Sequence, residues 1–401
     1  MSHTKATVLL AGLAMGLGGT AIAQTQSSSL DQARAYAAET RSDAQRATLN
    51  QGGAGGPEVF GRVQFQYNVT LIDDAGPGGE DFANGFQLRR TRLGAKGSVE
   101  SIKYYIQGDF SSSNGNFSLL DAFLTIPVPG MEDEASFTIG QFKLPFLHEE
   151  SMSSDRQLAV DRSFINDAFS QGRSQGIMFN YAGNEGDDYR VQVAFSDGFQ
   201  TANTRFDNAM EADFSIGGRF DYKVSGGWKD FEDFTAGPSQ EQALRFGGAI
   251  FYQSGDGTYA VGGATNELDL LSITVDGQWE QNGISVYGAF MLQDFDDGTT
   301  DDTSFGVLVQ AGYRFDENNE VFGRFEYLFE DNSAIEDFIA LTLGYNHYVF
   351  GNHNAKFTAD VTFVLETVAD TRFAGGSPSK GLLPDSGDPQ IIFRTQYQLA
   401  F

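Results

Sequence analysis

The last residues of the chain, Gln390–Phe401, read QIIFRTQYQLAF and alternate between apolar and polar side chains. In an extended strand one face would carry the apolar side chains, interrupted only by Thr395: Ile391, Phe393, Tyr397, Leu399 and Phe401. The other face would carry Arg394, Gln396 and Gln398. The stretch is therefore either the last strand of a soluble sandwich or a strand of a membrane wall, and the rest of the chain decides between them.

The same two-residue period recurs in sixteen segments from Glu58 onward. These segments lie near 58–70, 85–97, 101–112, 117–127, 136–143, 173–182, 188–198, 212–224, 243–254, 268–281, 283–296, 303–316, 319–331, 336–349, 353–366 and 390–401. Most have the roughly nine to eleven residues that a tilted strand needs to cross a bilayer. Tight turns are expected at 282–283, 316–319 and 351–354, and long loops at 71–84, 144–172, 255–267 and 367–389. The link 225–242 is an exception, because it is long where a short turn is expected, and the strand count could be off by a pair there.

Strands survive in lipid only if the sheet closes, because lipid cannot satisfy the backbone groups of an open edge. The sequence therefore predicts an all-β fold, a sixteen-stranded antiparallel transmembrane β-barrel over 58–401. Short turns at one rim and long loops at the other are typical of outer-membrane barrels. A barrel of this size encloses a lumen too wide for strand side chains to fill, which indicates a channel.

The composition excludes several other classes of protein. The net charge of −28 argues against a nucleic-acid partner, because phosphates require a basic surface. The absence of cysteine excludes disulfides and thiolate metal sites. The four histidines form no evident pair with a serine and an acid, so the sequence predicts no enzyme, no cofactor and no metal site.

The first residues, MSHTKATVLLAGLAMGLGGTAIAQ, have a basic start, an apolar centre and a small-residue cleavage site. They predict a signal peptide at 1–23, with cleavage after Ala23. Residues 24–57 follow as a periplasmic helix or tether. Small residues step by three and four through 29–50, so a short three-stranded coil and a loosely ordered tether both remain open.

Three stretches carry a family resemblance: GFQLRRTRLGAKG at 85–97, TIGQFKLPFLHEESMSSDRQLAVDRSFINDAFSQGRSQGI at 138–177, and YRVQVAFSDGF at 189–199. Together they resemble the phosphate-selective porins O and P. The resemblance implies a homotrimeric outer-membrane channel in contact with lipid. It also implies an inward-folded third loop that narrows the pore, and phosphate passage along inward arginines and loop lysines.

The paired arginines of that family map onto Arg89 and Arg90. Strict alternation would turn only one of the pair inward, so Arg89 is expected near the rim or on the loop side. Serine hydroxyls and basic groups of loop 144–172 could bind an anion, or the basic groups could instead pair with the loop's own carboxylates. The predicted pore-lining or anion-binding residues are Arg89, Arg90, Arg92, Lys143, Ser151, Ser153, Ser154, Arg156, Arg162 and Arg173.

The chain departs from the phosphate specialists in two ways. Loop 255–267 has no lysine, and many acidic residues share the inward face of the strands. The sequence predicts a passive diffusion channel for small hydrophilic solutes. The inward arginines favour anion or phosphate preference, whereas these two departures weigh against phosphate. The alternatives are a general or cation-preferring porin, and a structural or adhesive barrel whose acidic loops, such as 296–304, bind a partner or Ca²⁺.

Overall fold

The computed structural model describes residues 56–72, 82–111, 115–182, 187–206, 212–255, 259–261, 264–266, 268–296, 301–331, 335–384 and 389–401. The predicted signal peptide at 1–23 lies outside these ranges, as does nearly all of the helix or tether at 24–57. The acidic loop 296–304 is described only in part.

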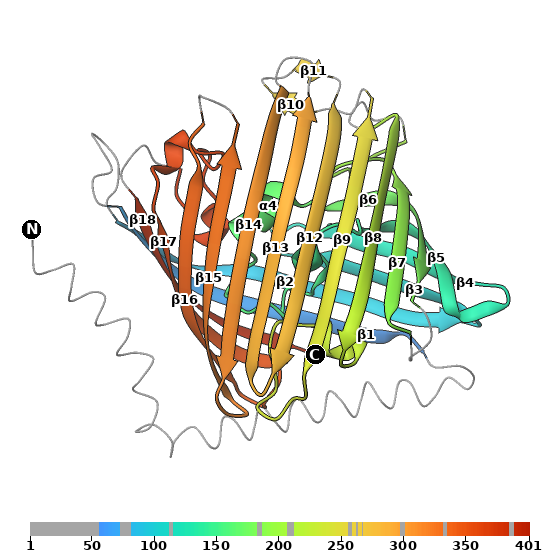
Figure 1. The fold of residues 1–401 in the computed structure, drawn as a ribbon, viewed down its shortest axis with the longest axis horizontal. Helices are drawn as coiled ribbons and strands as arrows, with labels where there is room; N and C mark the ends of the chain where they lie inside the picture. Colours follow the sequence, from blue (N-terminus) through green and yellow to red (C-terminus); the bar gives the residue numbers. More distant parts are fainter. Residues whose placement is uncertain are drawn as a thin grey trace, which may run out of the picture. The chain divides into compact units, whose positions relative to one another are not determined.

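Sixteen strands in the described part of the chain form one closed antiparallel barrel (Figure 1). They are β1 (Glu58–Ile72), β2 (Phe82–Val99), β3 (Ile102–Asp109), β4 (Ser118–Val128), β5 (Met131–Lys143), β6 (Arg173–Tyr181), β7 (Tyr189–Ser196), β8 (Phe214–Ser225), β9 (Ala243–Ser254), β12 (Asp269–Gln281), β13 (Ile284–Asp296), β14 (Asp301–Arg314), β15 (Asn319–Glu330), β16 (Phe338–Tyr348), β17 (Ala355–Val364) and β18 (Gln390–Ala400). Each strand pairs with its neighbours along the chain, and β18 pairs with β1. The predicted fold class and strand number are confirmed.

The structure shows how the strands around the uncertain link 225–242 and the long loop 255–267 are connected. β8 pairs directly with β9, so the link between them hides no strand pair. Two short strands, β10 (Tyr259–Val261) and β11 (Ala264–Asn266), pair with each other within the loop between β9 and β12. At the tight turn between β12 and β13, Asn282 and Gly283 both have positive φ, as the Asn-Gly pair predicts.

The aromatic C-terminus completes the barrel. The backbone N–H of Gly61 donates to the carbonyl of Phe401 at 2.9 Å, and the N–H of Phe401 donates to the carbonyl of Gly61 at 3.0 Å. A Cβ atom at position 61 would lie 2.7 Å from the Phe401 ring, so this close approach requires glycine. The QIIFRTQYQLAF stretch is therefore the closing strand, and its last residue pairs with the first strand.

The outer surface is apolar where the strands cross the expected bilayer. The outward positions carry exposed rings and branched chains, for example Phe65, Phe220, Phe290 and Leu343. Polar side chains occupy the alternate, inward positions. Among the residues that the structure describes, no helix is long and apolar enough to cross a membrane.

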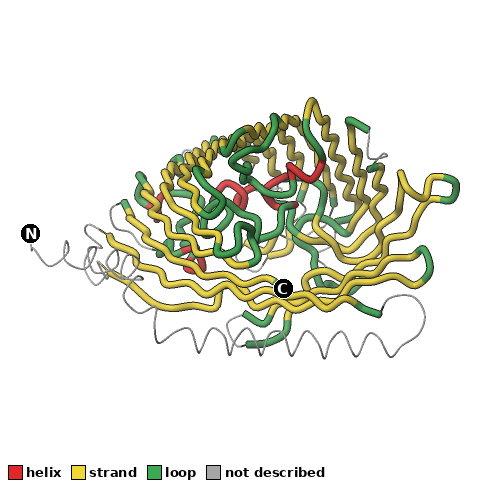
Figure 2. The backbone as a smooth tube through the Cα atoms, turned by 90° about the horizontal axis from the view of Figure 1, so that it is seen from below, coloured by secondary structure: helices red, strands yellow, loops and turns green. Residues whose placement is uncertain are grey.

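Loops and short helices lie inside the ring of strands (Figure 2). Residues of three chain segments pack there, and the sequence predicted the inward fold of only the first. Loop 144–172 carries α3 (His148–Ser151) and α4 (Phe164–Phe169), and we call it the constriction loop. The link 226–242 between β8 and β9 carries the 3₁₀ helix η1 (Trp228–Phe231). Loop 365–389 carries η2 (Val368–Asp370) and η3 (Pro378–Lys380).

An apolar core therefore lies inside the barrel and joins the three segments. Phe164 of the constriction loop lies 5.3 Å from Phe338 of β16 and 5.7 Å from Phe373 of loop 365–389, measured between ring centroids. Phe234 of link 226–242 lies 4.8 Å from Tyr287 of β13. Chain segments therefore fill part of the lumen, and more of them do so than the single inward-folded loop that the resemblance implies.

Candidate functional site

The constriction loop packs against one side of the lumen. Side chains of β16, β17 and β18 donate to its backbone carbonyls: Asn346 to Leu158 at 2.9 Å, Lys356 to Gln157 at 2.6 Å, and Gln398 to Asp155 at 2.9 Å. On this side, which we call the packed wall (β12–β18), inward side chains such as Thr342, Thr358 and Asp360 are fully buried.

The opposite side of the lumen differs. On β3–β7, which we call the open wall, the inward side chains Tyr105, Thr125, Asn180 and Gln192 remain partly exposed. These side chains therefore line an accessible part of the lumen, on the side of the open wall.

A β-bulge turns both arginines of the Arg89–Arg90 pair inward. Gln64 of β1 pairs with Arg90, and the next residue, Phe65, pairs with Leu88, so Arg89 is the extra residue on β2. The expectation that only one arginine of the pair turns inward is wrong, and Arg89 faces the constriction loop. Strict alternation fails at a bulge, because the inserted residue resets the direction of the side chains.

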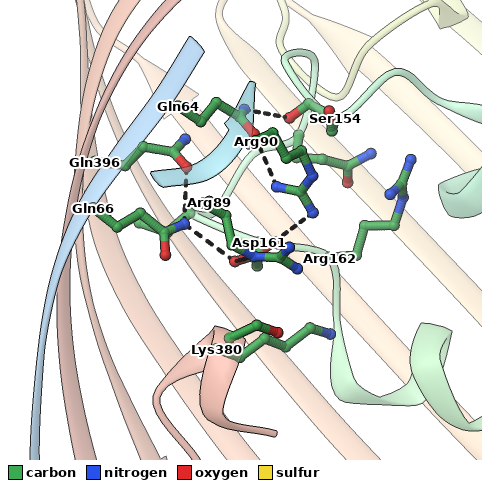
Figure 3. A network of polar contacts seen from close by, with 12 residues as sticks. Gln64, Gln66, Arg89, Arg90, Ser154, Asp161, Arg162, Lys380 and Gln396 are labelled. Carbon is green, nitrogen blue, oxygen red and sulfur yellow. Dashed lines mark hydrogen bonds and ion pairs between the residues drawn. The ribbon is translucent and has the colours of Figure 1, made fainter. Parts of the chain in front are cut away.

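Both arginines bind one carboxylate of the constriction loop, that of Asp161 (Figure 3). Arg89 Nε lies 3.0 Å from one carboxylate oxygen, and Arg90 Nη2 lies 2.7 Å from the other. Gln66 Nε2 donates to the same group at 3.2 Å. Burial opposes ionisation of Asp161, but Arg89, Arg90 and the charges of Lys380 and Arg394 hold its pKa well below its usual range.

A second carboxylate, that of Glu150, is shared in the same way. Arg162 Nε lies 3.3 Å from it and Lys143 Nζ lies 3.7 Å from it. Lys143 also donates to the Glu150 carbonyl at 2.6 Å, and Arg162 donates to the Met152 carbonyl at 2.6 Å. Burial opposes ionisation, but Arg162 and Lys143 hold the pKa of Glu150 at about 2.

Two arginines, one at the edge of the open wall and one on it, bind carboxylates of other strands. Arg92 of β2 binds Asp109 of β3 at 2.8 Å. Arg173 of β6 binds both carboxylate oxygens of Asp121 on β4, at 2.9 and 3.0 Å. The first pair links adjacent strands, and the second spans β5, which lies between β4 and β6. The charged ends of both pairs remain partly accessible from the lumen.

Arg156 is the most exposed of the predicted basic residues. Its side chain is 39% exposed, and it lies 3.9 Å from the Asp155 carboxylate and 3.5 Å from that of Asp233. Asp233 belongs to link 226–242, so two inward segments meet at this arginine. Such long contacts on a half-exposed group hold Arg156 loosely.

The three predicted serines are engaged within the protein. Ser151 donates to the Leu147 carbonyl at 3.0 Å, and Ser153 donates to the Asp155 carboxylate. Ser154 accepts from Arg62 of β1, which also binds Ser153 and Asp155. The hydroxyl hydrogens of Ser151 and Ser153 are thus directed to acceptors of the constriction loop.

In the structure the basic groups pair with carboxylates, as the alternative predicted. The basic groups outnumber the carboxylates. Eight basic side chains share six carboxylates. The basic residues are Arg62, Arg89, Arg90, Arg92, Lys143, Arg156, Arg162 and Arg173, and the acidic ones are Asp109, Asp121, Glu150, Asp155, Asp161 and Asp233. Of the eight, Arg62, Arg90 and Arg162 are buried, whereas the other five are partly exposed.

Sequence reasoning missed the contributions of two segments. Asp233 reaches Arg156 from link 226–242, and Lys380 of loop 365–389 binds Asp167 of the constriction loop at 2.6 Å. The signal for the link was its length together with Phe231 and Phe234, since apolar rings are unusual in an exposed turn. No feature of the neighbouring sequence predicts the role of Lys380. Among the described residues, no three His, Asp or Glu side chains form a metal-binding group.

A closed sixteen-stranded wall, an apolar outer surface and a charged constriction define an outer-membrane channel of the porin class. The family model for phosphate-selective porin O and P matches residues 59–371. The chain belongs to this family, and the family and fold indicate a channel rather than an enzyme.

Solved structures share the fold at low sequence identity. An anion-selective porin from Comamonas acidovorans aligns with a TM-score of 0.57 and 16% identity, over 86% of this chain and 99% of that one. The outer membrane protein OmpT of Vibrio cholerae, in its trimer form, aligns with a TM-score of 0.55 and 12% identity, over 87% and 100%. The channel DcaP of Acinetobacter baumannii aligns with a TM-score of 0.55 and 12% identity, over 87% of this chain and 99% of that one. A comparison with curated proteins gives no match.

Proposed function

We propose that this porin is a passive diffusion channel with a weak preference for small anions. The observation that carries the proposal is the excess of basic side chains at the constriction, where eight share six carboxylates. Five of these basic groups are partly exposed, so a passing ion meets more positive than negative charge.

The net charge of the whole chain does not decide the selectivity. The chain carries −28, and removal of the proposed signal peptide, whose only charged residue is Lys5, would make the mature charge −29. Salt screens such distant charges beyond about 10 Å at 0.1 M ionic strength. The groups within a few ångströms of the path therefore dominate.

The proposed preference is weak because each basic group already has an acidic neighbour. A phosphate would have to compete with a tethered carboxylate at every arginine, and loop 255–267 supplies no lysine to concentrate it. We therefore expect small anions such as chloride to pass more readily than cations, with little trapping of phosphate. The family and the trimeric OmpT support the proposal that the channel is a homotrimer.

The test is the reversal potential of single channels in a planar bilayer under a KCl gradient. We expect a potential on the anion side for the wild type. Arg156→Gln should move it toward the cation side, because this substitution removes the most exposed of these charges. The matched control, Lys229→Gln, makes the same charge change on the exposed surface of link 226–242 and should leave the potential unchanged.

A cation-preferring general porin is the second candidate, and the acidic composition favours it. In that case the wild-type potential would lie on the cation side. Neither Arg156→Gln nor added phosphate would then reverse it. A barrel that conducts no ions at all would point to the structural or adhesive alternative.

A further inference from the structure

The Arg89–Arg90 pair already holds an anion, and that anion is part of the chain. The Asp161 carboxylate accepts from both guanidinium groups and from Gln66, at 2.7 to 3.2 Å (Figure 3). Its side chain is fully buried. This geometry, with two planar guanidinium groups converging on two oxygens, is the one by which arginines bind free carboxylates and phosphates.

The chain builds this arrangement with several independent features. The bulge on β2 brings Arg89 to the same side as Arg90. The carbonyl of Asp161 accepts from Arg324 of β15 at 2.9 Å, which fixes the backbone that carries the carboxylate. The positive charge of Lys380 acts on the same carboxylate from loop 365–389.

We propose that Arg89 and Arg90 form a binding site for a small planar anion, and that Asp161 fills it as a tethered ligand, so that no solute anion is held there. The consequence for transport rests on the proposed function. With the paired arginines occupied, solutes meet only the half-exposed basic groups of the open wall and the constriction loop. Asp161 is thus a specificity-determining residue, which lowers the affinity of the pore for anions without contacting the solute.

The site favours an anion of the size and shape of a carboxylate. Removing the side chain beyond Cβ in Asp161→Ala would leave the buried Arg90 and the partly exposed Arg89 without their counter-ion, beside a space that fits one carboxylate group. Formate supplies the missing group with the same two acceptor oxygens. Phosphate is larger and tetrahedral, so it should fit the buried space less well.

The first test measures the thermal unfolding midpoint of the purified full-length protein in detergent, with sodium gluconate replaced stepwise by sodium formate. We expect formate to raise the midpoint of Asp161→Ala by several degrees and phosphate to raise it less. The wild type and Asp133→Ala should not respond. Asp133→Ala is the control, because it removes the same charge at an exposed position near the start of β5. An Asp161→Ala protein with equal midpoints in gluconate and formate would overturn the proposal.

A second variant covers the case in which Asp161→Ala does not fold in either salt. Asp161→Asn keeps the shape of the side chain and removes only its charge. We expect it to raise the chloride-to-potassium permeability ratio, and Asp167→Asn to raise it less; equal changes would overturn the proposal. A wild-type channel that prefers cations would contradict the proposed function, yet the formate test would still decide whether the site exists.

Discussion

The two walls of the lumen use the same kind of ion pair in different surroundings. On the packed wall, Arg394 and Asp360 bind at 2.8 Å with side chains that are 2% and 0% exposed. At the edge of the open wall, Arg92 and Asp109 bind at the same distance, but each side chain is 12% exposed. The first pair anchors the constriction loop, since Asp360 also accepts from the Val160 backbone N–H at 3.1 Å. We call the inward segments packed against this wall the plug. The second pair presents its charge to the lumen.

The difference shows that an arginine on the inner face of a barrel does not by itself indicate transport. Charges sealed between a wall and a plug lose their hydration, so they need close partners in order to stay ionised. Charges beside the aqueous path keep part of their hydration and act on passing ions. Burial, rather than residue type, separates the two roles.

The largest expected effect is that of breaking a sealed pair. Asp360→Ala leaves Arg394 buried without its counter-ion and removes the acceptor of the Val160 N–H, and we expect it to destabilise the folded barrel by about 4 kcal/mol. Asp109→Ala, at the edge of the open wall, should cost about 1 kcal/mol, because water reaches Arg92. The urea midpoint of unfolding in detergent measures both. Equal losses would show that the two walls do not differ.

A cavity in the core of the plug should have a somewhat smaller effect. Leu158 of the constriction loop is almost fully buried, and Leu158→Ala should cost about 3 kcal/mol. We expect the loop to loosen, so that single-channel conductance rises and the current becomes noisier. Leu399→Ala, on the lipid-facing side of β18, is the control and should leave conductance unchanged. An unchanged conductance in Leu158→Ala would mean that the loop does not limit the path.

Acid should release the constriction loop at a low pH. The pKa of Glu150 lies at about 2 in the folded protein, below its usual value of 4.5. A lowered pKa means that the carboxylate stabilises the docked loop above pH 4.5 and that this contribution is lost as the pH falls toward about 2. The same sign holds for Asp161, whose pKa is also lowered.

Single-channel recordings across that range test this expectation. The current should stay steady from pH 7 to about 5 and become noisy between about 4.5 and 2. Glu150→Gln should show noise already at neutral pH. A transition near pH 6 in the wild type would contradict the assignment, since neither carboxylate titrates there.

The smallest expected effect is that of one open-wall charge on selectivity. A unit charge about 6 Å from a passing ion in a water-like medium contributes roughly 0.7 kcal/mol, or about threefold in permeability ratio. Arg173→Gln should therefore lower the chloride-to-potassium ratio by up to about threefold. Lys356→Gln, which alters a buried charge of the packed wall, should change the ratio less. A larger change in the ratio for Lys356→Gln than for Arg173→Gln would show that the packed wall, and not the open wall, acts on passing ions.

The wall of the barrel could be predicted from the sequence because each strand and turn is specified by residues close together in the chain. Each strand alternates apolar and polar residues, and turns such as Asn282–Gly283 carry their own conformational signature. The closing strand followed from the alternation of Gln390–Phe401 together with that of the other fifteen segments.

The candidate site could be predicted only in part, because it depends on a β-bulge and on contacts between residues far apart in the chain. A two-residue period cannot detect the bulge that turns Arg89 inward. Eight of the ten predicted residues lie in the constriction loop or contact it, whereas Arg92 and Arg173 bind carboxylates of the strands. The acidic partners Asp109, Asp121 and Asp233 come from distant segments. Link 226–242 folds inward where Phe234 packs against Tyr287, and no local sequence pattern predicts this contact between distant residues.

The division of the lumen can be tested directly because the chain contains no cysteine. Single substitutions Gln192→Cys on the open wall and Thr358→Cys on the packed wall can be exposed to a charged, water-soluble thiol reagent while channel current is recorded. We predict that the current through Gln192→Cys changes upon labelling and that Thr358→Cys does not react. Equal labelling of both positions would contradict the claim that one wall is sealed and the other carries the solute.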